Sequence, residues 1–398
     1  MNRREFVKAT LLSAAALELA GPAASQSPPT KMRAAIIGHT GQGDYGHGLD
    51  TIFANRSGVT VVALADPDAA GRAKTALKCG ASRQYADYRE MLERERPQLV
   101  SIAMRHASQH FDIALAALKN GAHIYCEKPF TTTPAESDQL LAEARQRGLK
   151  IAVAHTMRMT PILRRLKQEL DGDLIGRLIE MRAYGKQDTR AGGEDMMVLG
   201  SHLFDLMRMF AGDPFWCTAR VLWKGKDITS KDGRLVQDNV GLVAGDAVFA
   251  QFAFPNSVQA TFTSVEKLRE STGHWGIELH GSKGVVRINC DVSPNVFIHQ
   301  ASPWNEAGKT DLWKPLYPEL APANPRPNDG PVTDWLEAIS KNREPECSGA
   351  NGAWAVEMVL AVYESALSEM RTRFPLKVRT HPLATHARRD GAPAALER

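Results

Sequence analysis

A lysine with chemical potential stands directly after a short apolar stretch at 122–126, in the segment Glu127-Lys128-Pro129. In an open α/β sheet, ligands bind in the crevice beyond the carboxyl ends of the strands. A lysine at such an end can reach into the crevice as a compact donor whose pKa responds to burial. The alternative is a surface Glu–Lys pair before a turn proline. The surrounding elements must decide between these two interpretations.

The first of these elements is a buried-strand pattern at 32–37 that runs into a glycine-rich loop. Five glycines fall within eleven residues: Gly38, Gly41, Gly43, Gly46 and Gly48. Residues 41–46 satisfy G-x-G-x-x-G, but the glycine at the strand end is Gly38, which also fits a Gly38–Gly41 turn with an insertion. In both cases backbone amides can approach a pyrophosphate, and the helix that we expect over 48–55 offers its N-terminus. A glycine-rich surface loop would give the same pattern.

An acidic residue follows the second strand pattern, at 59–65. Asp66 lies twenty residues after Gly46, where the carboxylate that holds the adenosine ribose hydroxyls is expected. Such a carboxylate would repel a 2′-phosphate, so the sequence favours NAD over NADP. Arg72 weakens this preference slightly, because it could meet a phosphate. Asp66 could also cap the helix that begins near Ala69, and the two roles are compatible.

The order of the predicted elements gives the fold class. Strand patterns at 99–103, 124–126 and 150–154 alternate with helix patterns at 111–119 and 134–147. This alternation predicts a doubly wound parallel α/β sheet. Beyond residue 155, several strands at short spacing and helices at 164–171, 197–210, 331–341 and 351–371 predict a second, sheet-rich α/β domain. Residues 382–398 have the composition of a loose tail.

Length and composition exclude several classes of protein. A chain of 398 residues is too long for one ordinary hydrophobic core, so we expect two domains. The formal net charge of +4 is small and no Lys/Arg run occurs, which argues against a nucleic-acid partner. The five cysteines lie far apart without a C-x-x-C pair, so neither a metal site nor a disulfide framework is predicted.

The N-terminus predicts export. Arg3-Arg4, with Phe6 and Lys8, precedes an apolar run at 9–20 and small residues up to 25. This arrangement resembles a twin-arginine signal over residues 1–25, and it predicts a periplasmic protein without a membrane span in the mature chain. The alternative is an amphipathic helix of the mature fold, which Glu18 slightly favours.

Taken together, these motifs resemble the Gfo/Idh/MocA family of oxidoreductases. The resemblance is carried by the glycine loop, Asp66, His110, the "GxHVxxEKP"-like segment 121–129 and the segment 155–161. It implies an NAD(P)-binding Rossmann domain at 32–155 and a C-terminal domain at 156–376, with a tail at 377–398. The second domain should contain a large, open, mostly antiparallel sheet that shields the nicotinamide. That sheet often forms the subunit contact, so a homo-oligomer, a dimer or a tetramer, is implied.

The family resemblance also implies a chemistry. Members oxidise or reduce a secondary hydroxyl of a sugar or cyclitol, which requires a hydride acceptor, a proton acceptor and donors to the developing alkoxide. Lys128 maps to the lysine beside the reacting hydroxyl. His202 maps to the acid/base histidine of the "DxGxH" helix, and an imidazole suits that role because its pKa lies near neutrality. With the glycines and Asp66, the cofactor contacts implied are His110, Glu127, Lys128 and Arg158.

One departure from the family pattern concerns this helix. The aspartate expected four residues before His202 is Val198, which can neither orient the histidine nor bind a hydroxyl. Glu194 and Asp195, in the preceding turn, are the candidates to replace it. Arg190 should also face the cleft, and Asp205 shares a helix face with His202. These acidic and basic residues fit a polar carbohydrate, an anionic one included.

Three functions follow. The leading one is an NAD(P)-dependent sugar oxidoreductase with a tightly held cofactor, because an exported enzyme would have no supply of free NAD. A retained cofactor must return to its starting state, as in transhydrogenation between two sugars. The second is a redox-neutral glycoside hydrolase or lyase that passes through a keto-sugar. The third, motivated by Val198, is a non-catalytic protein that binds a carbohydrate or a nucleotide.

Overall fold

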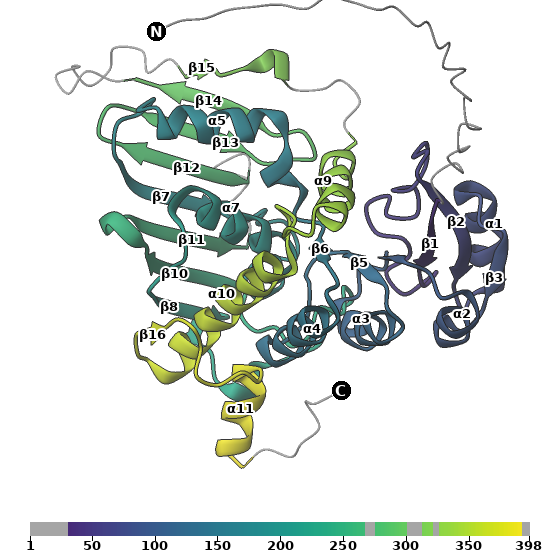
Figure 1. Cartoon of the computed structure of the whole chain (residues 1–398). Coiled ribbons are helices and arrows are strands. Elements are labelled where there is room, and N and C mark those ends of the chain that lie inside the picture. Colours follow the sequence, from purple (N-terminus) through teal and green to yellow (C-terminus); the bar gives the residue numbers. More distant parts are fainter. Residues whose placement is uncertain (1–30, 267–274, 301–312, 321–325, 392–398) are drawn as a thin grey trace, which may run out of the picture.

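The computed structural model describes residues 31–266, 275–300, 313–320 and 326–391 (Figure 1). The predicted export signal at 1–25 lies outside these residues. The described chain forms two sheets with helices packed against them, and the α/β class predicted from the sequence is confirmed. None of its described helices is long and apolar enough to cross a membrane.

The first sheet has six parallel strands in the order β3-β2-β1-β4-β5-β6. The strands are β1 (Met32–Ile37), β2 (Val59–Ala65), β3 (Arg83–Tyr85), β4 (Leu99–Ile102), β5 (His123–Cys126) and β6 (Ile151–Val153). Four helices follow strands of this sheet: α1 (Ala69–Cys79), α2 (Tyr88–Glu95), α3 (His110–Lys119) and α4 (Pro134–Arg147). The strand order reverses between β1 and β4, and in such sheets the ligand crevice opens at this switch point.

Local sequence signals determine several of these elements. The strand β1 ends in four consecutive apolar residues, Ala34 to Ile37, all of which are buried. The helix α4 begins with a capping box between Thr133 and Glu136, has Pro134 in its first turn and ends at Gly148 in the left-handed conformation. These are the residue types that start and stop helices. The position of β5, and hence of Glu127 and Lys128 after it, therefore follows from the sequence.

The segment between β1 and β2 differs from the prediction. The helix expected over 48–55 does not form, and residues 40–55 consist of turns. Four glycines here, Gly41, Gly43, Gly46 and Gly48, have φ of +79°, +87°, +54° and +83°, which interrupts any helix in this stretch. The segment therefore offers no helix N-terminus to a pyrophosphate, and its contacts must come from the loop itself.

The second sheet has ten strands and is mostly antiparallel, as the resemblance implies. Its order is β15-β14-β13-β12-β7-β11-β10-β8-β16, with β9 paired to β8, and the one parallel pairing on this path joins β7 to β11. The strands are β7 (Leu178–Tyr184), β8 (Trp216–Trp223), β9 (Lys226–Asp227), β10 (Ala247–Ala253), β11 (Gln259–Val265), β12 (Gly276–Gly281), β13 (Val285–Asn289), β14 (Asn295–His299), β15 (Lys314–Pro315) and β16 (Thr372–Arg373).

Helices from the second half join the two sheets. The helices α5 (Pro161–Asp171), α7 (Ser201–Ala211) and α10 (Gly349–Ser368) lie across one face of the larger sheet (Figure 1). The helix α10 also contacts α4 and β6, and α9 (Asp329–Ser340) contacts β6. Trp335 of α9 is fully buried, with its ring 5.8 Å from that of Tyr125 in β5. These contacts hold the end of β5 against the second domain.

The C-terminal segment is more ordered than the sequence suggested. In place of the loose tail expected from residue 382, the chain forms α11 (Pro382–Arg389) with Leu383 fully buried. The His381 side chain accepts a hydrogen bond from the backbone amide of Leu383 at the start of the helix, at 3.3 Å. The prediction was wrong because Leu383 packs against distant core residues that local composition does not reveal.

Candidate functional site

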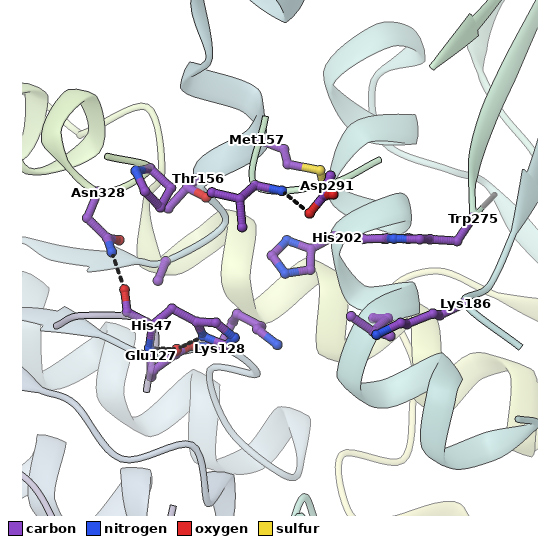
Figure 2. A pocket seen from close by; sticks show the side chains of 14 residues that line it. His47, Glu127, Lys128, Thr156, Met157, Lys186, His202, Trp275, Asp291 and Asn328 are labelled. Atoms are coloured by element: carbon purple, nitrogen blue, oxygen red, sulfur yellow. Dashed lines mark hydrogen bonds and ion pairs between the residues drawn. The ribbon is translucent and has the colours of Figure 1, made fainter. Parts of the chain in front are cut away.

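A cavity of about 190 Å³ lies between the end of β5 and the second domain (Figure 2). Its lining residues come from both halves of the chain: His47, Glu127, Lys128, Ala154, Thr156, Met157, Lys186, Leu199, His202, Trp275, Asp291, Val292, Pro327 and Asn328. A neighbouring cavity of about 230 Å³ shares four of these residues and adds Arg105, Pro129, Arg190, Val198, Asp238 and Val240. The two cavities together form the candidate active-site cleft.

Lys128 enters this cleft from the end of β5. The residue is 6% exposed, and its Nζ donates to the carbonyl oxygen of Val198 at 3.1 Å. Val198 belongs to a π-helical turn, Met196–Gly200 (η3), which leads directly into α7. Burial lowers the pKa of Lys128, and the charge of Glu127 opposes this shift. Val198 thus contributes a backbone acceptor at the position where the family pattern has a carboxylate.

Glu127 is fully buried beside Lys128 and is held by the loop after β1. Its carboxylate accepts hydrogen bonds from the backbone amide and the Nδ1 of His47 and from the backbone amide of Lys128. Burial acts to raise the pKa of Glu127, but the hydrogen bond and charge of His47 and the charge of Lys128 hold it below its usual value. The carboxylate is therefore ionised and fixes the loop at the cleft.

His202 lines the cleft from the first turn of α7. Its ring centroid lies 5.4 Å from that of His155 and 6.4 Å from that of Trp275. Burial, followed by the charges of Lys128 and His155, holds the pKa of His202 well below its usual value. The imidazole is therefore neutral near pH 7 and able to accept a proton.

Asp66 lies at the carboxyl end of β2 and is fully buried. Its Oδ2 accepts the hydroxyl of Thr40 at 2.6 Å and the phenol of Tyr45 at 2.7 Å, and its Oδ1 accepts the amide of Asp68 at 2.9 Å. Burial opposes ionisation, but the bonds from Thr40 and Tyr45 keep the pKa of Asp66 below its usual value. A carboxylate that takes two hydroxyl donors has the chemistry to hold the two hydroxyls of an adenosine ribose.

Three glycines of the loop lie so close to neighbouring atoms that a side chain would not fit. A Cβ on Gly38 would lie 2.1 Å from the ring of Tyr45, and one on Gly46 would lie 2.6 Å from the carbonyl oxygen of Ala103. A Cβ on Gly43 would lie 2.7 Å from the amide nitrogen of Arg105, whereas Gly41 has open space around it. The loop glycines and Asp66 are residue types that suit the binding of NAD. The side chain of Tyr45 lies where the loop meets Asp66.

Two of the residues predicted from the sequence, His110 and Asp195, lie beside the cleft and do not line it. His110 is fully buried and bonds through its two ring nitrogens to the carbonyl oxygens of Pro129 and Met104, both at 2.8 Å. Asp195 accepts from Ser264 Oγ at 2.6 Å and from the amide of Gln187 at 3.0 Å. Both side chains therefore secure the backbone next to the cleft, and neither lines its two cavities.

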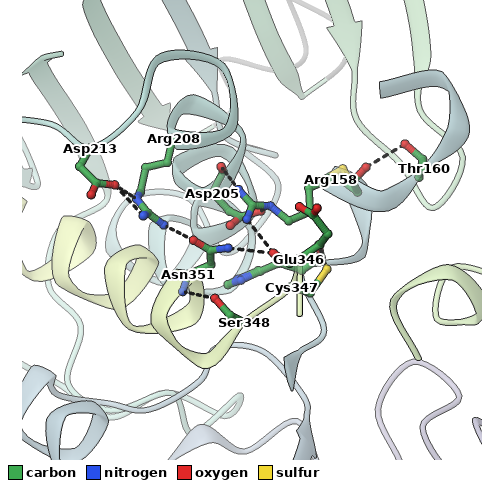
Figure 3. Close-up of polar contacts among 11 residues, drawn as sticks. Arg158, Thr160, Asp205, Arg208, Asp213, Glu346, Cys347, Ser348 and Asn351 are labelled. Carbon is green, nitrogen blue, oxygen red and sulfur yellow. Dashed lines mark hydrogen bonds and ion pairs between the residues drawn. The ribbon is translucent and has the colours of Figure 1, made fainter. Parts of the chain in front are cut away.

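Arg158 and Asp205 pair with each other behind His202. Arg158 Nε lies 3.0 Å from Asp205 Oδ2, and Arg158 also donates to the carbonyl oxygen of Glu346 at 2.9 Å (Figure 3). This pair ties the turn Thr156–Met159 (η2) to α7 and to the segment before α10. Neither residue lines the two cavities of the cleft.

The remaining predicted residues, Arg190 and Glu194, are partly buried near the second cavity. Arg190 lines it and pairs with Asp188 at 2.8 Å and with Asp238 at 3.5 Å. Burial and the charge of Asp238 raise the pKa of Glu194, which lines neither cavity. Of Arg190 and Glu194, Arg190 is therefore the residue that a substrate in the cleft could meet.

Sequence reasoning missed several residues of the cleft. The side chains of His47, Thr156, Lys186, Trp275 and Asn328 line the first cavity (Figure 2). The sequence could have indicated Lys186 as a cleft residue, because Lys186 ends a strand pattern as Lys128 does. Trp275 and Asn328 had none, since each comes close to the cleft through packing between distant segments.

Comparisons with known proteins agree with this architecture. The chain is 24% identical over 348 residues to levoglucosan dehydrogenase of Pseudarthrobacter phenanthrenivorans, covering 78% of this chain and 87% of that protein. It is 24% identical to D-apiose dehydrogenase of Paraburkholderia graminis, covering 78% and 81% of the two chains. The solved structure of levoglucosan dehydrogenase in complex with NADH and levoglucosan superposes with a TM-score of 0.69 at 20% identity, over 87% of this chain and all of that one.

Two family models match most of the chain. Residues 32–155 match the model described as "Oxidoreductase family, NAD-binding Rossmann fold", and residues 180–374 match the model of the C-terminal alpha/beta domain of the same family. The first match confirms NAD as the cofactor expected from Asp66. With Lys128 and His202 facing one cleft between these two domains, the chain belongs to the Gfo/Idh/MocA family and is an NAD(P)-dependent oxidoreductase.

Proposed function

We propose that this oxidoreductase acts on a secondary hydroxyl of a sugar or sugar derivative. The observation that carries the proposal is that Lys128, His202 and Trp275 line one cavity, although they come from distant parts of the chain. The named relatives, which include a levoglucosan dehydrogenase, a D-apiose dehydrogenase and a 1,5-anhydro-D-fructose reductase, support a sugar substrate. An aromatic face beside polar groups suits the mixed apolar and hydroxylated surface of a sugar ring.

The residues divide the chemistry between them. NAD, held by the loop after β1 and by Asp66, would supply the acceptor for the hydride of the carbon that carries the reacting hydroxyl. His202, held neutral by burial, takes the hydroxyl proton. Lys128 donates a hydrogen bond to the same oxygen and stabilises the negative charge that develops there. Because burial has removed water from the lysine, this interaction is stronger than it would be in bulk solvent.

We further propose that the protein is exported by the twin-arginine route to the periplasm and keeps its NAD bound. The support is the Arg3-Arg4 signal in the sequence. With a retained cofactor, the net reaction is transhydrogenation or, as the second candidate, redox-neutral cleavage of a glycoside through a keto-sugar. A homo-oligomer is also proposed, supported by Phe249, which is 44% exposed on β10 of the open sheet.

Two measurements test this function. Mass spectrometry of the supernatant from denatured, purified protein should find NAD or NADH in stoichiometric amount. Sugars added singly and in pairs should then change the absorbance of the bound nicotinamide. Lys128→Met and His202→Ala should each lower turnover by about 10²–10⁴-fold, while Lys226→Met, on the exposed strand β9, should not. A protein that neither retains nor binds a dinucleotide would overturn the proposal.

A further inference from the structure

Buried polar atoms without hydrogen-bond partners gather behind His202. Within the described residues, Nδ1 of His202, both ring nitrogens of His155 and Oδ1 of Asp205 are all buried and unpaired. His155 is 1% exposed and Asp205 is 1% exposed. Buried polar groups in folded proteins are nearly always paired, so a group of unpaired atoms at one place calls for a functional explanation.

The two histidines face each other. His155 follows β6 and His202 begins α7, yet their ring centroids are 5.4 Å apart and their planes cross at 77°. The edge of one imidazole therefore points at the other. At this spacing a small ring rotation or one water can connect a nitrogen of His155 to Nδ1 of His202.

Four charged side chains act on His155 from the elements packed around it. Asp205 reaches it from α7, Arg158 from η2, and Lys128 and Glu127 from the end of β5. Burial lowers the pKa of His155 to about 4, against the charge of Asp205, which acts to raise it. No carboxylate of the described chain raises the pKa of His202, whose neighbours are Lys128, His155 and His47. The negative charge of Asp205 can therefore reach His202 through His155.

We propose that His155 is a positioning residue for His202 and replaces the aspartate that the family pattern has at position 198. After a small rotation of the rings, or through one water, one nitrogen of His155 would accept the Nδ1–H of His202 and the other would donate to Oδ1 of Asp205. This arrangement leaves Nε2 of His202 with a free lone pair in the cleft. When Nε2 takes the hydroxyl proton, the imidazolium keeps its Nδ1–H bonded to His155. The proposal rests on the function proposed above.

The first test needs no turnover. We would record the ¹⁵N resonances of the imidazole nitrogens in the wild type, in His155→Phe and in His155→Gln. In the wild type, His202 should carry its proton on Nδ1 in a hydrogen bond. The Phe variant should lose this preference and the Gln variant, which can still accept and donate, should retain part of it. An unchanged tautomer and titration of His202 in His155→Phe would overturn the proposal.

The second test uses activity and a matched control. His155→Phe should lower kcat at least tenfold with little change in KM, because the Nδ1–H of His202 loses the acceptor that holds it. His381→Asn removes another buried histidine, which caps α11 and lines neither cavity of the cleft, and this variant should change neither kcat nor KM. If His155→Phe does not fold, Asp205→Asn tests the same chain of His202, His155 and Asp205 and should also lower kcat. Full activity of Asp205→Asn would count against the proposal.

The two tests separate this proposal from the proposed function. Wild-type protein that binds NAD but turns over no sugar would contradict the function, while the ¹⁵N spectra would still decide the role of His155. Active wild type with an equally active His155→Phe would contradict the role of His155 and leave the function standing.

Discussion

The phenol of Tyr45 donates a hydrogen bond of 2.7 Å to Oδ2 of Asp66. The same oxygen accepts the hydroxyl of Thr40, and the ring of Tyr45 lies against Gly38. These contacts occupy the carboxylate that is suited to the ribose hydroxyls of NAD. A dinucleotide whose ribose binds Asp66 would compete with the phenol for this carboxylate.

Removing this hydroxyl should strengthen NAD binding. In Tyr45→Phe the ring can remain against Gly38, but Asp66 loses one competing donor. Since a hydrogen bond contributes about 0.5–1.5 kcal/mol net, we expect a gain in NAD affinity of about two- to tenfold. Calorimetric titration of protein freed of nucleotide measures it, with Tyr88→Phe on α2 as the matched control. Weaker binding by Tyr45→Phe would show that the phenol assists the cofactor.

Restoring a carboxylate at position 198 should change the pH dependence of catalysis. The carboxylate of Val198→Asp would lie near His202 and Lys128, and an adjacent negative charge favours the imidazolium. The acidic limb of kcat/KM should therefore move to higher pH by about one to three pH units. Val198→Asn, which adds the same polar shape without charge, should leave the limb in place. An equal effect of both variants would rule out an electrostatic cause.

Stability should fall as the pH is lowered from neutrality. Burial lowers the pKa of His155 and of His381 from 6.5 to about 4. The unfolded chain therefore takes up protons at these residues near pH 6.5, whereas the folded chain does not until about pH 4, so folding is progressively disfavoured across this window.

Denaturant unfolding at several pH values measures this effect. His381→Asn keeps a side chain that can cap α11 but cannot titrate. The free energy of unfolding of this variant should depend less steeply on pH than that of the wild type between pH 6.5 and about 4. Identical slopes would mean that His381 does not contribute.

Trp275 should affect the sugar more than the cofactor. Its ring faces the cavity beside His202 (Figure 2). Trp275→Ala should raise KM for the sugar about tenfold, because about 1.5 kcal/mol or more of apolar contact is lost, and it should leave NAD affinity nearly unchanged. Steady-state kinetics and calorimetry measure the two effects, with Trp216→Ala on β8 as a control outside the cavity. A loss confined to NAD affinity would contradict this assignment.

Local patterns accounted for the parts of the protein that depend on neighbouring residues. The strands that precede Asp66 and Glu127 are short and mostly apolar, and α4 is framed by Thr133 and Gly148. Because parallel strands bring their carboxyl ends to one edge, these patterns were enough to place Asp66 and Lys128 at the cofactor side of the sheet.

The contacts between distant segments were decided by the tertiary structure. The loop after β1 is tied to the strand ends by the bonds of Tyr45 to Asp66 and of His47 to Glu127, and α11 formed because Leu383 is buried against distant core residues. The approach of His155 to His202 depends on how the two domains pack, which no local periodicity encodes. The sequence by itself therefore determined the family, the cofactor and the lysine, whereas the packing of the two domains decided which side chains surround the acid/base histidine.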